Sequence, residues 1–142
     1  MILDRIKFIH LASDHAGLSH KEEIRLWLEN SVYQVVDHGA SLLHPLDDFT
    51  DFVSKAAKAV SDLPEESCAI IFGGSGQGEA MVANRFPQVR ATVYYGGNEE
   101  IVRLSRQHND ANVLSIGARF VDTRDALRVI ELWLHEAPLQ DE

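Results

Sequence analysis

The stretch 72–79 reads F-G-G-S-G-Q-G-E, in which four glycines and a serine lead to a carboxylate at Glu79. The apolar run 68–72 before it is typical of a strand buried on both faces, and 79–83 is typical of a helix start. A glycine-rich turn between a strand and a helix aligns free backbone N–H groups, which bind anions. The stretch therefore predicts an anion site with an acid or base beside it.

Two nucleotide-binding motifs fit this stretch poorly. The third glycine of a dinucleotide fingerprint falls on Glu79, where a carboxylate would face a pyrophosphate. A dinucleotide fingerprint also includes an acid about 20 residues later, which binds the ribose. In this chain that position falls at 94–98, where there is no acidic residue. No lysine follows the glycines, as a P-loop requires. We therefore expect no nucleotide cofactor.

Strand and helix patterns alternate along the whole chain. Strands are expected at 6–12, 32–36, 68–72, 90–95 and 113–116. Helices are expected at 19–30, behind a capping box at Ser19-His20-Lys21-Glu22, at 50–61, at 79–85, after Asn98 and over 126–137. Five such βα units predict one α/β domain over residues 1–142, a three-layer α/β/α sandwich with a five-stranded parallel, Rossmann-like sheet. The order of the strands does not follow from the pattern.

Composition limits the partners. The chain is 45% hydrophobic and 25% charged, with a formal net charge of -9 and no basic cluster, which argues against nucleic acid and membrane surfaces. The single cysteine, Cys68, precludes an internal disulfide and is expected to be an inert core thiol. No apolar run reaches the ~20 residues of a membrane span, and the N-terminus lacks a signal peptide pattern. We expect a cytoplasmic protein.

Further polar motifs accompany the predicted strands. Ser13-Asp14-His15-Ala16-Gly17 follows the first strand, and Gly117-Ala118-Arg119 follows the fifth. The fourth βα unit ends in R-Q-H-N-D-A-N at 106–112. In order and spacing, this set resembles the type B ribose-5-phosphate isomerases, which share a family with galactose-6-phosphate isomerase. The resemblance extends over about residues 6–135.

The resemblance implies an enzyme that interconverts aldose and ketose phosphates through an enediolate, without a metal or another cofactor. It also implies a homodimer with active sites shared across the interface. One branch of the family uses a cysteine at the position of Gly73 as the base, whereas the other uses the glutamate that closes the loop. Glu79 is therefore the expected base. Its place at a helix start favours a low pKa and burial a high one, and the sequence leaves this open.

The resemblance also assigns the remaining site residues. His108 matches the histidine that opens the sugar ring. The expected substrate-binding residues are Asp14, His15, Gly74, Ser75, Gly76, Gln77, Gly78, Asn109 and Arg119. Simpler structural roles stay open for several of them: a helix acid for Glu79, a structural histidine for His108, an Asx turn for Asp14 and a surface ion pair for Arg119. The other histidines are expected to be structural or solvated, without a metal, and Trp27 and Trp133 to lie in the core.

Two segments depart from the family pattern. Phosphate-using relatives carry an arginine-rich C-terminal tail, whereas no arginine follows Arg128 here. A common D-Y-P-x-F segment reads D-F-T-D-F at 48–52. The expected reaction is the conversion of ribose 5-phosphate to ribulose 5-phosphate, with a weakened grip on the phosphate. The alternatives are isomerisation of another phosphorylated or free sugar, or a non-catalytic sugar-binding partner subunit.

Overall fold

The computed structural model describes residues 5–40 and 49–139. Strands and helices alternate along them, as the sequence pattern predicts. The strands are β1 (Phe8–Ser13), β2 (Gln34–Asp37), β3 (Ser67–Gly73), β4 (Ala91–Tyr94) and β5 (Val113–Gly117). The helices are the 3-10 helix η2 (His15–Gly17) and the α-helices α1 (Leu18–Leu28), α2 (Phe49–Asp62), α3 (Gln77–Ala83), α4 (Glu100–Gln107) and α5 (Thr123–His135).

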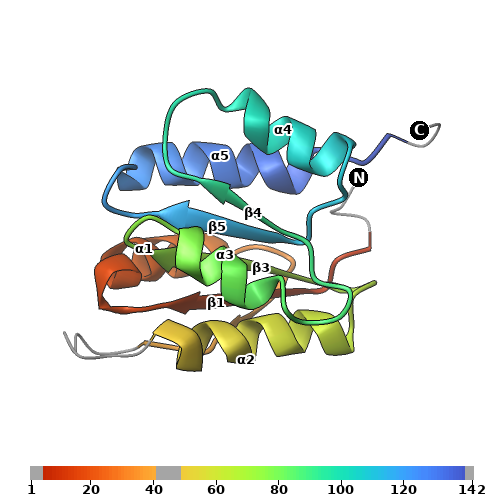
Figure 1. The fold of residues 1–142 in the computed structure, drawn as a ribbon, viewed down its shortest axis with the longest axis horizontal. Helices are drawn as coiled ribbons and strands as arrows, with labels where there is room; N and C mark the ends of the chain where they lie inside the picture. The colour runs from red at the N-terminus through yellow and green to blue at the C-terminus, as the bar shows by residue number, and fades with distance from the viewer. Residues whose placement is uncertain (1–4, 41–48, 140–142) are drawn as a thin grey trace.

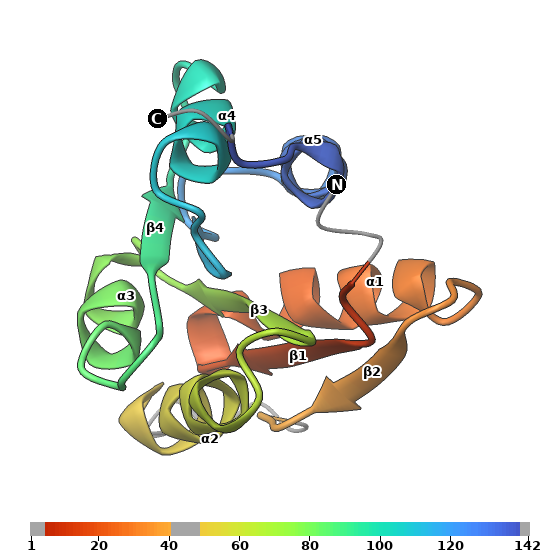
Figure 2. The same cartoon turned by 90° about the vertical axis from the view of Figure 1, so that its right-hand side faces the viewer.

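All five of these strands pair in parallel in the order β2-β1-β3-β5-β4. β3 lies at the centre and is buried throughout, because helices cover both faces of the sheet. Its residues Cys68, Ile70 and Phe72 pack in a core with α1, α4 and α5. Ala69 and Ile71 point to the opposite core, under α2 and α3. The three-layer α/β/α architecture expected from the sequence is confirmed (Figures 1 and 2).

The strand order creates a switch point between β1 and β3. From β1 the chain proceeds outward to β2, whereas after β3 it proceeds to the other side of the sheet, to β4 and β5. The loops that follow β1 and β3 therefore diverge and leave a crevice at the carboxyl ends of these strands, where open α/β sheets bind ligands. The Asp14 segment and the glycine loop both begin at this crevice.

Local predictions near α1 need correction. The capping box at Ser19-His20-Lys21-Glu22 is wrong, because α1 already begins at Leu18 and Gly17 precedes it without a side-chain cap. Trp133 is fully buried as expected, but Trp27 is 38% exposed. Trp27 instead lines a surface groove together with Val32 and Leu134, which lie near the ends of α1 and α5.

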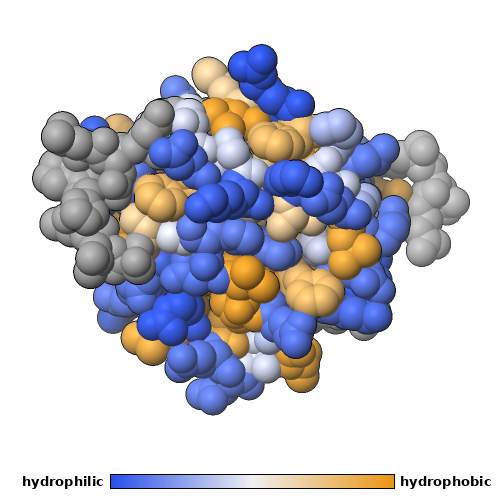
Figure 3. All heavy atoms as spheres, turned by 90° about the horizontal axis from the view of Figure 1, so that it is seen from below, coloured by the Kyte–Doolittle hydropathy of each residue, from blue (hydrophilic) through white to orange (hydrophobic). Residues whose placement is uncertain are grey.

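The face that α2 covers is mainly hydrophilic, with smaller apolar groups between the polar side chains (Figure 3). Larger exposed apolar side chains occur around the β4 side of the sheet. Met81 lies on α3, and Ile101 and Leu104 lie on α4. Tyr95 directly follows β4, and Phe120 lies three residues after the end of β5. Within residues 5–40 and 49–139, no helix is long and apolar enough to cross a membrane.

Candidate active site

The glycine loop, residues 73–78, connects the carboxyl end of β3 to α3. Gly76 has a φ of +82°, a left-handed conformation that glycine adopts without strain. The hydroxyl of Ser115 on β5 donates to the carbonyl of Gly76 at 2.6 Å and fixes this turn. In the described part of the chain, the N–H groups of Gly74 and Ser75 donate to no other group. They are therefore free to bind an anionic oxygen.

The side chain of Glu79 folds back from the first turn of α3 onto the end of β3. A Cβ atom added to Gly73 would lie only 2.0 Å from Oε1 of Glu79 and 2.1 Å from its Cδ. The carboxylate therefore occupies the space that any larger residue at position 73 would need. Glu79 is 5% exposed, so this acid lies inside the crevice and not on the helix surface.

The structure resolves the competing influences on the pKa of Glu79. Burial, which penalises the charged form, raises the pKa above its usual value, and the nearby carboxylate of Asp14 raises it further. Interactions with the backbone N–H groups of Glu79 and Gly76 lower it but do not outweigh the burial. A raised pKa brings a carboxylate closer to the working pH of a general base.

Asp14 and His15 reach the same crevice from the end of β1. Oδ1 of Asp14 accepts hydrogen bonds from the N–H groups of Ala16 at 2.8 Å and Gly17 at 3.2 Å. The Asx turn left open by the sequence is thus present, and it orients the carboxylate whether or not Asp14 binds a substrate. Nδ1 of His15 is buried and has no hydrogen-bond partner among the described residues.

Gly17 brings this segment against β3. A Cβ atom on Gly17 would lie 2.4 Å from Cβ of Phe72, so only glycine permits the close approach. The N–H group of Asp14 also donates to the carbonyl of Phe72, at 3.4 Å. The loops that follow β1 and β3 are therefore packed directly on each other, which places the Asp14 carboxylate near that of Glu79.

Arg119 borders the crevice on the β5 side. Its backbone N–H donates to the carbonyl of Gly74 at 3.0 Å, and the N–H of Ala118 donates to Gly73 at 2.7 Å. The Arg119 guanidinium lies over Gly74, where an added Cβ atom would be 3.3 Å from Cζ. Within the described residues it forms no ion pair, so the surface pairing considered from the sequence is not found there.

His108 and Asn109 lie at the opposite end of the sheet. They follow α4 and precede β5, whereas Arg119 follows β5. At about 3.3 Å per residue, a five-residue strand separates its two ends by roughly 15 Å. Figure 1 shows that α4 runs back from the carboxyl ends of the strands toward their amino ends. A single chain thus assembles Asp14, Glu79 and Arg119 but does not bring His108 to them.

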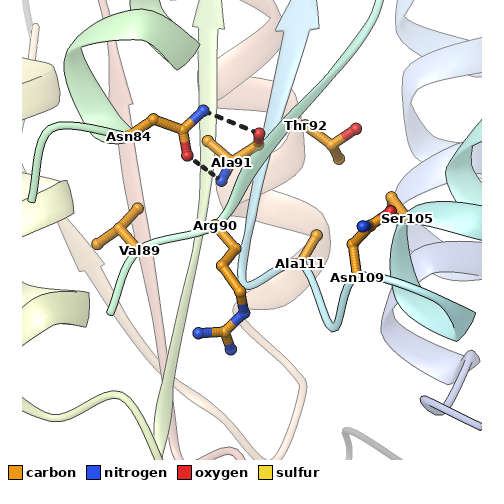
Figure 4. Close-up of a pocket in the computed structure, with 8 residues that line it drawn as sticks. All are labelled: Asn84, Val89, Arg90, Ala91, Thr92, Ser105, Asn109 and Ala111. Carbon is orange, nitrogen blue, oxygen red and sulfur yellow. Dashed lines mark hydrogen bonds between the residues drawn. The ribbon is translucent and has the colours of Figure 1, made fainter. Parts of the chain in front are cut away.

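Asn109 borders a separate cavity of about 310 Å³ (Figure 4). Ser105 lies beside it, and Arg90 extends from the start of β4. Asn84 is held there by two hydrogen bonds to the backbone of Ala91, at 2.7 and 3.1 Å. Because these amide atoms are already bonded, Asn84 has little capacity left to bind a ligand in this cavity.

Neither the thiol nor the remaining histidines suggest a second chemistry. Burial raises the pKa of Cys68 to about 12, which keeps the thiol protonated. His10 Nδ1 and His38 Nε2 lie 2.8 Å apart and form a pair between β1 and the end of β2. Across the described ranges, no group of three His, Cys, Asp or Glu side chains is arranged to hold a metal ion. His44 lies outside the described residues.

Sequence reasoning did not identify Ser115. It is fully buried in β5, and its hydroxyl bond to Gly76 supports the glycine loop from the neighbouring strand. The available signal was one polar residue inside the otherwise apolar run Val113-Leu114-Ser115-Ile116. A buried hydroxyl needs a partner, and here the partner is a loop carbonyl that sequence spacing does not reveal.

A family model described as Ribose/Galactose Isomerase matches residues 9–141. The chain therefore belongs to this family of isomerases. Among curated proteins, ribose-5-phosphate isomerase B of Mycolicibacterium paratuberculosis is 35% identical over 127 residues, covering 89% of this chain and 77% of the relative. The Escherichia coli protein of the same name is 34% identical over 129 residues, covering 91% of this chain and 84% of the relative.

Solved structures are similar in fold over nearly the whole chain. Ribose-5-phosphate isomerase B from Mycoplasma genitalium, with bound ribulose-5-phosphate, has a TM-score of 0.89 and 32% identity, covering 95% of this chain and 88% of that one. The Clostridium thermocellum protein has a TM-score of 0.86 and 35% identity, covering 94% and 87%. The resemblance derived from the motifs is thus confirmed.

Proposed function

We propose that this chain, as a single sugar-phosphate isomerase domain over residues 1–142, interconverts ribose 5-phosphate and ribulose 5-phosphate with Glu79 as the base. The observation that carries the proposal is the buried Glu79 carboxylate against Gly73, directly beside the unpaired N–H groups of the glycine loop. Relatives at about 35% identity bear the name ribose-5-phosphate isomerase B, and one similar structure holds ribulose-5-phosphate. These groups supply the base and the oxyanion donors of the isomerisation step.

In the proposed step, one carboxylate removes and returns the same proton. The carboxylate of Glu79 takes the proton from C2 of the open-chain aldose, and the electron pair of that bond forms the C1–C2 double bond. The carbonyl electrons move to O1, where the loop N–H groups stabilise the negative charge of the enediolate. The hydroxyl proton passes from O2 to O1, and Glu79 returns its proton to C1 to give the ketose. The base thus ends the cycle as it began.

At the phosphate end, we propose that Arg119 and His15 bind the dianion. Arg119 is exposed at the mouth of the crevice without an ion pair among the described residues, and His15 lies next to Asp14 on the segment packed against β3. An arginine fork is suited to phosphate oxygens. The carboxylate of Asp14 is proposed to bind sugar hydroxyls between the phosphate and Glu79.

We also propose a homodimer whose active sites combine Glu79 of one subunit with His108 and Asn109 of the other. The roughly 15 Å between the two ends of β5 supports this, because one subunit cannot place both groups on one sugar. The exposed apolar side chains Met81, Ile101 and Leu104 lie on helices that flank the edge strand β4 and offer a surface for a second copy (Figure 2). A cytoplasmic location stays a prediction from the sequence.

Purified protein incubated with ribose 5-phosphate, free ribose and galactose 6-phosphate tests the reaction, with ketose formation as the readout. We expect ketose from ribose 5-phosphate at the highest kcat/KM. Turnover of another sugar alone would reassign the substrate, and binding without ketose from any sugar would favour the non-catalytic partner subunit.

Mixing two impaired variants tests the shared site. If Glu79→Gln and His108→Ala proteins exchange subunits, each mixed dimer contains one intact site, and random mixing restores about a quarter of wild-type activity. Each variant alone serves as the control. No recovery, despite mixed dimers detected by mass spectrometry, would place both groups in the same subunit and overturn the shared-site proposal.

A further inference from the structure

The turn that presents His108 and Asn109 is held by a charged network at Asp110. Both side chains are exposed, and Asp110 next to them has a φ of +46°, a left-handed conformation that aspartate tolerates better than most residues. The N–H of Asp110 donates to the carbonyl of Arg106 at 3.2 Å. The backbone therefore turns sharply just after the proposed ring-opening histidine.

Three arginines from different parts of the chain converge on the Asp110 carboxylate. Oδ1 accepts from Arg106 at 2.8 Å and from Arg5 at 3.3 Å, and Oδ2 lies 3.5 Å from a guanidinium nitrogen of Arg90. Nε of Arg90 also donates to the Asp110 carbonyl at 2.8 Å. Asp110 is thus fixed by bonds from α4, from the start of β4 and from the chain before β1.

Arg106 is the buried member of this network. It is fully buried at the end of α4, with its guanidinium 5.9 Å from the ring of Trp133. Beyond Asp110, it donates to the carbonyls of Ala111 at 2.7 Å and Glu136 at 3.0 Å. Burying a charge is costly, and an ion pair often does not repay that cost. The network is therefore better explained by the geometry that it imposes than by stability.

The segment after α5 holds the same turn from its other side. Gln107, directly before His108, donates through Nε2 to the Glu136 carboxylate at 2.7 Å. The carbonyl of Gln107 accepts from the N–H of Leu139 at 3.0 Å. The residues on both sides of His108 and Asn109 are thus anchored, while these two side chains project outward.

We propose that Arg106 and Asp110 are positioning residues that hold His108 in the orientation required by the active site of the second subunit. The inference rests on the proposed role of His108. A catalytic group presented to another subunit starts from a turn of its own chain, and here that turn is fixed by bonds within the same chain. Misplacement by about 1 Å can cost a hundredfold in rate, which is the scale that such a network controls.

A double-mutant cycle with Asp110→Asn and His108→Ala tests the proposal. Asparagine keeps the shape of Asp110 and tolerates the left-handed backbone, but it removes the charge that gathers the arginines. We expect kcat/KM for ribose 5-phosphate to fall about 10- to 100-fold in Asp110→Asn. In the His108→Ala background, where sugar opens only spontaneously, the same change should cost less than about twofold, because residues that act as a unit are not additive.

Asp125→Asn is the matched control, since Asp125 pairs with Arg128 on the exposed surface of α5 at 3.0 Å. It should leave kcat/KM unchanged in both backgrounds. Arg106→Lys, which keeps the charge but cannot fork onto three oxygens, should repeat the Asp110→Asn pattern if it folds. Circular dichroism and dimer mass verify folding of each variant.

The outcomes separate the two proposals. If His108→Ala is impaired but Asp110→Asn retains wild-type kcat/KM, or costs the same factor in both backgrounds, the positioning role is overturned and the proposed function stands. If His108→Ala itself has wild-type turnover, the proposed role of His108 fails, and the positioning role fails with it.

Discussion

Glu79→Gln separates the proposed base from a simple helix acid. Glutamine keeps the size of the side chain against Gly73 and removes only the ionisable oxygen, so the glycine loop is expected to retain its shape. A positioned general base contributes about 10²- to 10⁴-fold, so turnover of ribose 5-phosphate should fall at least ~100-fold. At about 1.4 kcal/mol for each factor of ten, the barrier rises by at least about 2.7 kcal/mol. Ketose formation under saturating substrate measures this loss.

The same substitution should change stability with a definite sign. Burial raises the pKa of Glu79, so the folded protein holds this proton more tightly than the unfolded chain does. The corresponding stability is fully present below the unfolded pKa and is lost as the pH rises through the folded pKa. At a pH above the folded pKa, the free energy of unfolding is lower by about 1.4 kcal/mol for each unit by which the pKa of Glu79 is raised on folding. Glu79→Gln avoids the cost and should be more stable than wild type in urea at pH 8, but not at pH 4.

Glu100→Gln is the control for the helix-acid alternative. Glu100 is also in the first turn of a helix, but its side chain is 48% exposed beside Arg103. Removing that charge should cost a few tenths to about 1 kcal/mol of stability and leave turnover unchanged. If Glu79→Gln behaves like Glu100→Gln, with lower stability at pH 8 and near-normal turnover, the assignment of Glu79 as the base is refuted.

Three further substitutions test neighbouring conclusions. Cys68→Ala should lower the free energy of unfolding by roughly 1–2 kcal/mol, because it opens a small cavity in the core, and should leave kcat/KM intact; lost turnover in a folded variant would implicate the thiol. Arg119→Ala should raise the KM for ribose 5-phosphate about tenfold or more with little effect on free ribose, whereas equal changes for both sugars would move the phosphate pocket elsewhere. His10→Asn should make stability depend less on pH in the acid range. Burial and His38 lower the pKa of His10 to about 4, so the free energy of unfolding of the wild type, measured in urea, should fall by roughly 3 kcal/mol between pH 6.5 and pH 4. An unchanged slope in the variant would show that His10 does not cause that loss.

The parts of the fold with a local cause could be predicted from the sequence. The continuous apolar run of β3 reflects burial on both faces, and glycines where no side chain fits mark the loop that follows it. The order of the strands could not be predicted, because each βα unit can cross to either side of a neighbour. The prediction that Trp27 lies in the core was wrong for a related reason. The helix pattern shows an apolar stripe, but it does not show how far the element that packs on this stripe extends.

The candidate site was predictable as a set of residues but not as an arrangement. The pKa of Glu79 depends on burial and on Asp14, which β1 brings near only through its pairing with β3. The position of His108 depends on the direction of α4, which carries the chain to the far end of the sheet. The His10–His38 pair joins residues of two neighbouring strands, and their separation in sequence gives no hint of the contact.

The overlap between Gly73 and Glu79 limits how this family can change its catalyst. A Gly73→Cys substitution alone would place a Cβ atom 2.0 Å from Oε1 of Glu79 and displace the proposed base before the new thiol could act. Loss of Glu79 alone would remove the proposed base before a cysteine could replace it. Each single step therefore passes through an impaired protein, and only the paired change connects a glutamate enzyme to a cysteine enzyme. We therefore expect relatives with a glutamate base and relatives with a cysteine base to form separate lineages, because the intermediates between them would have low activity.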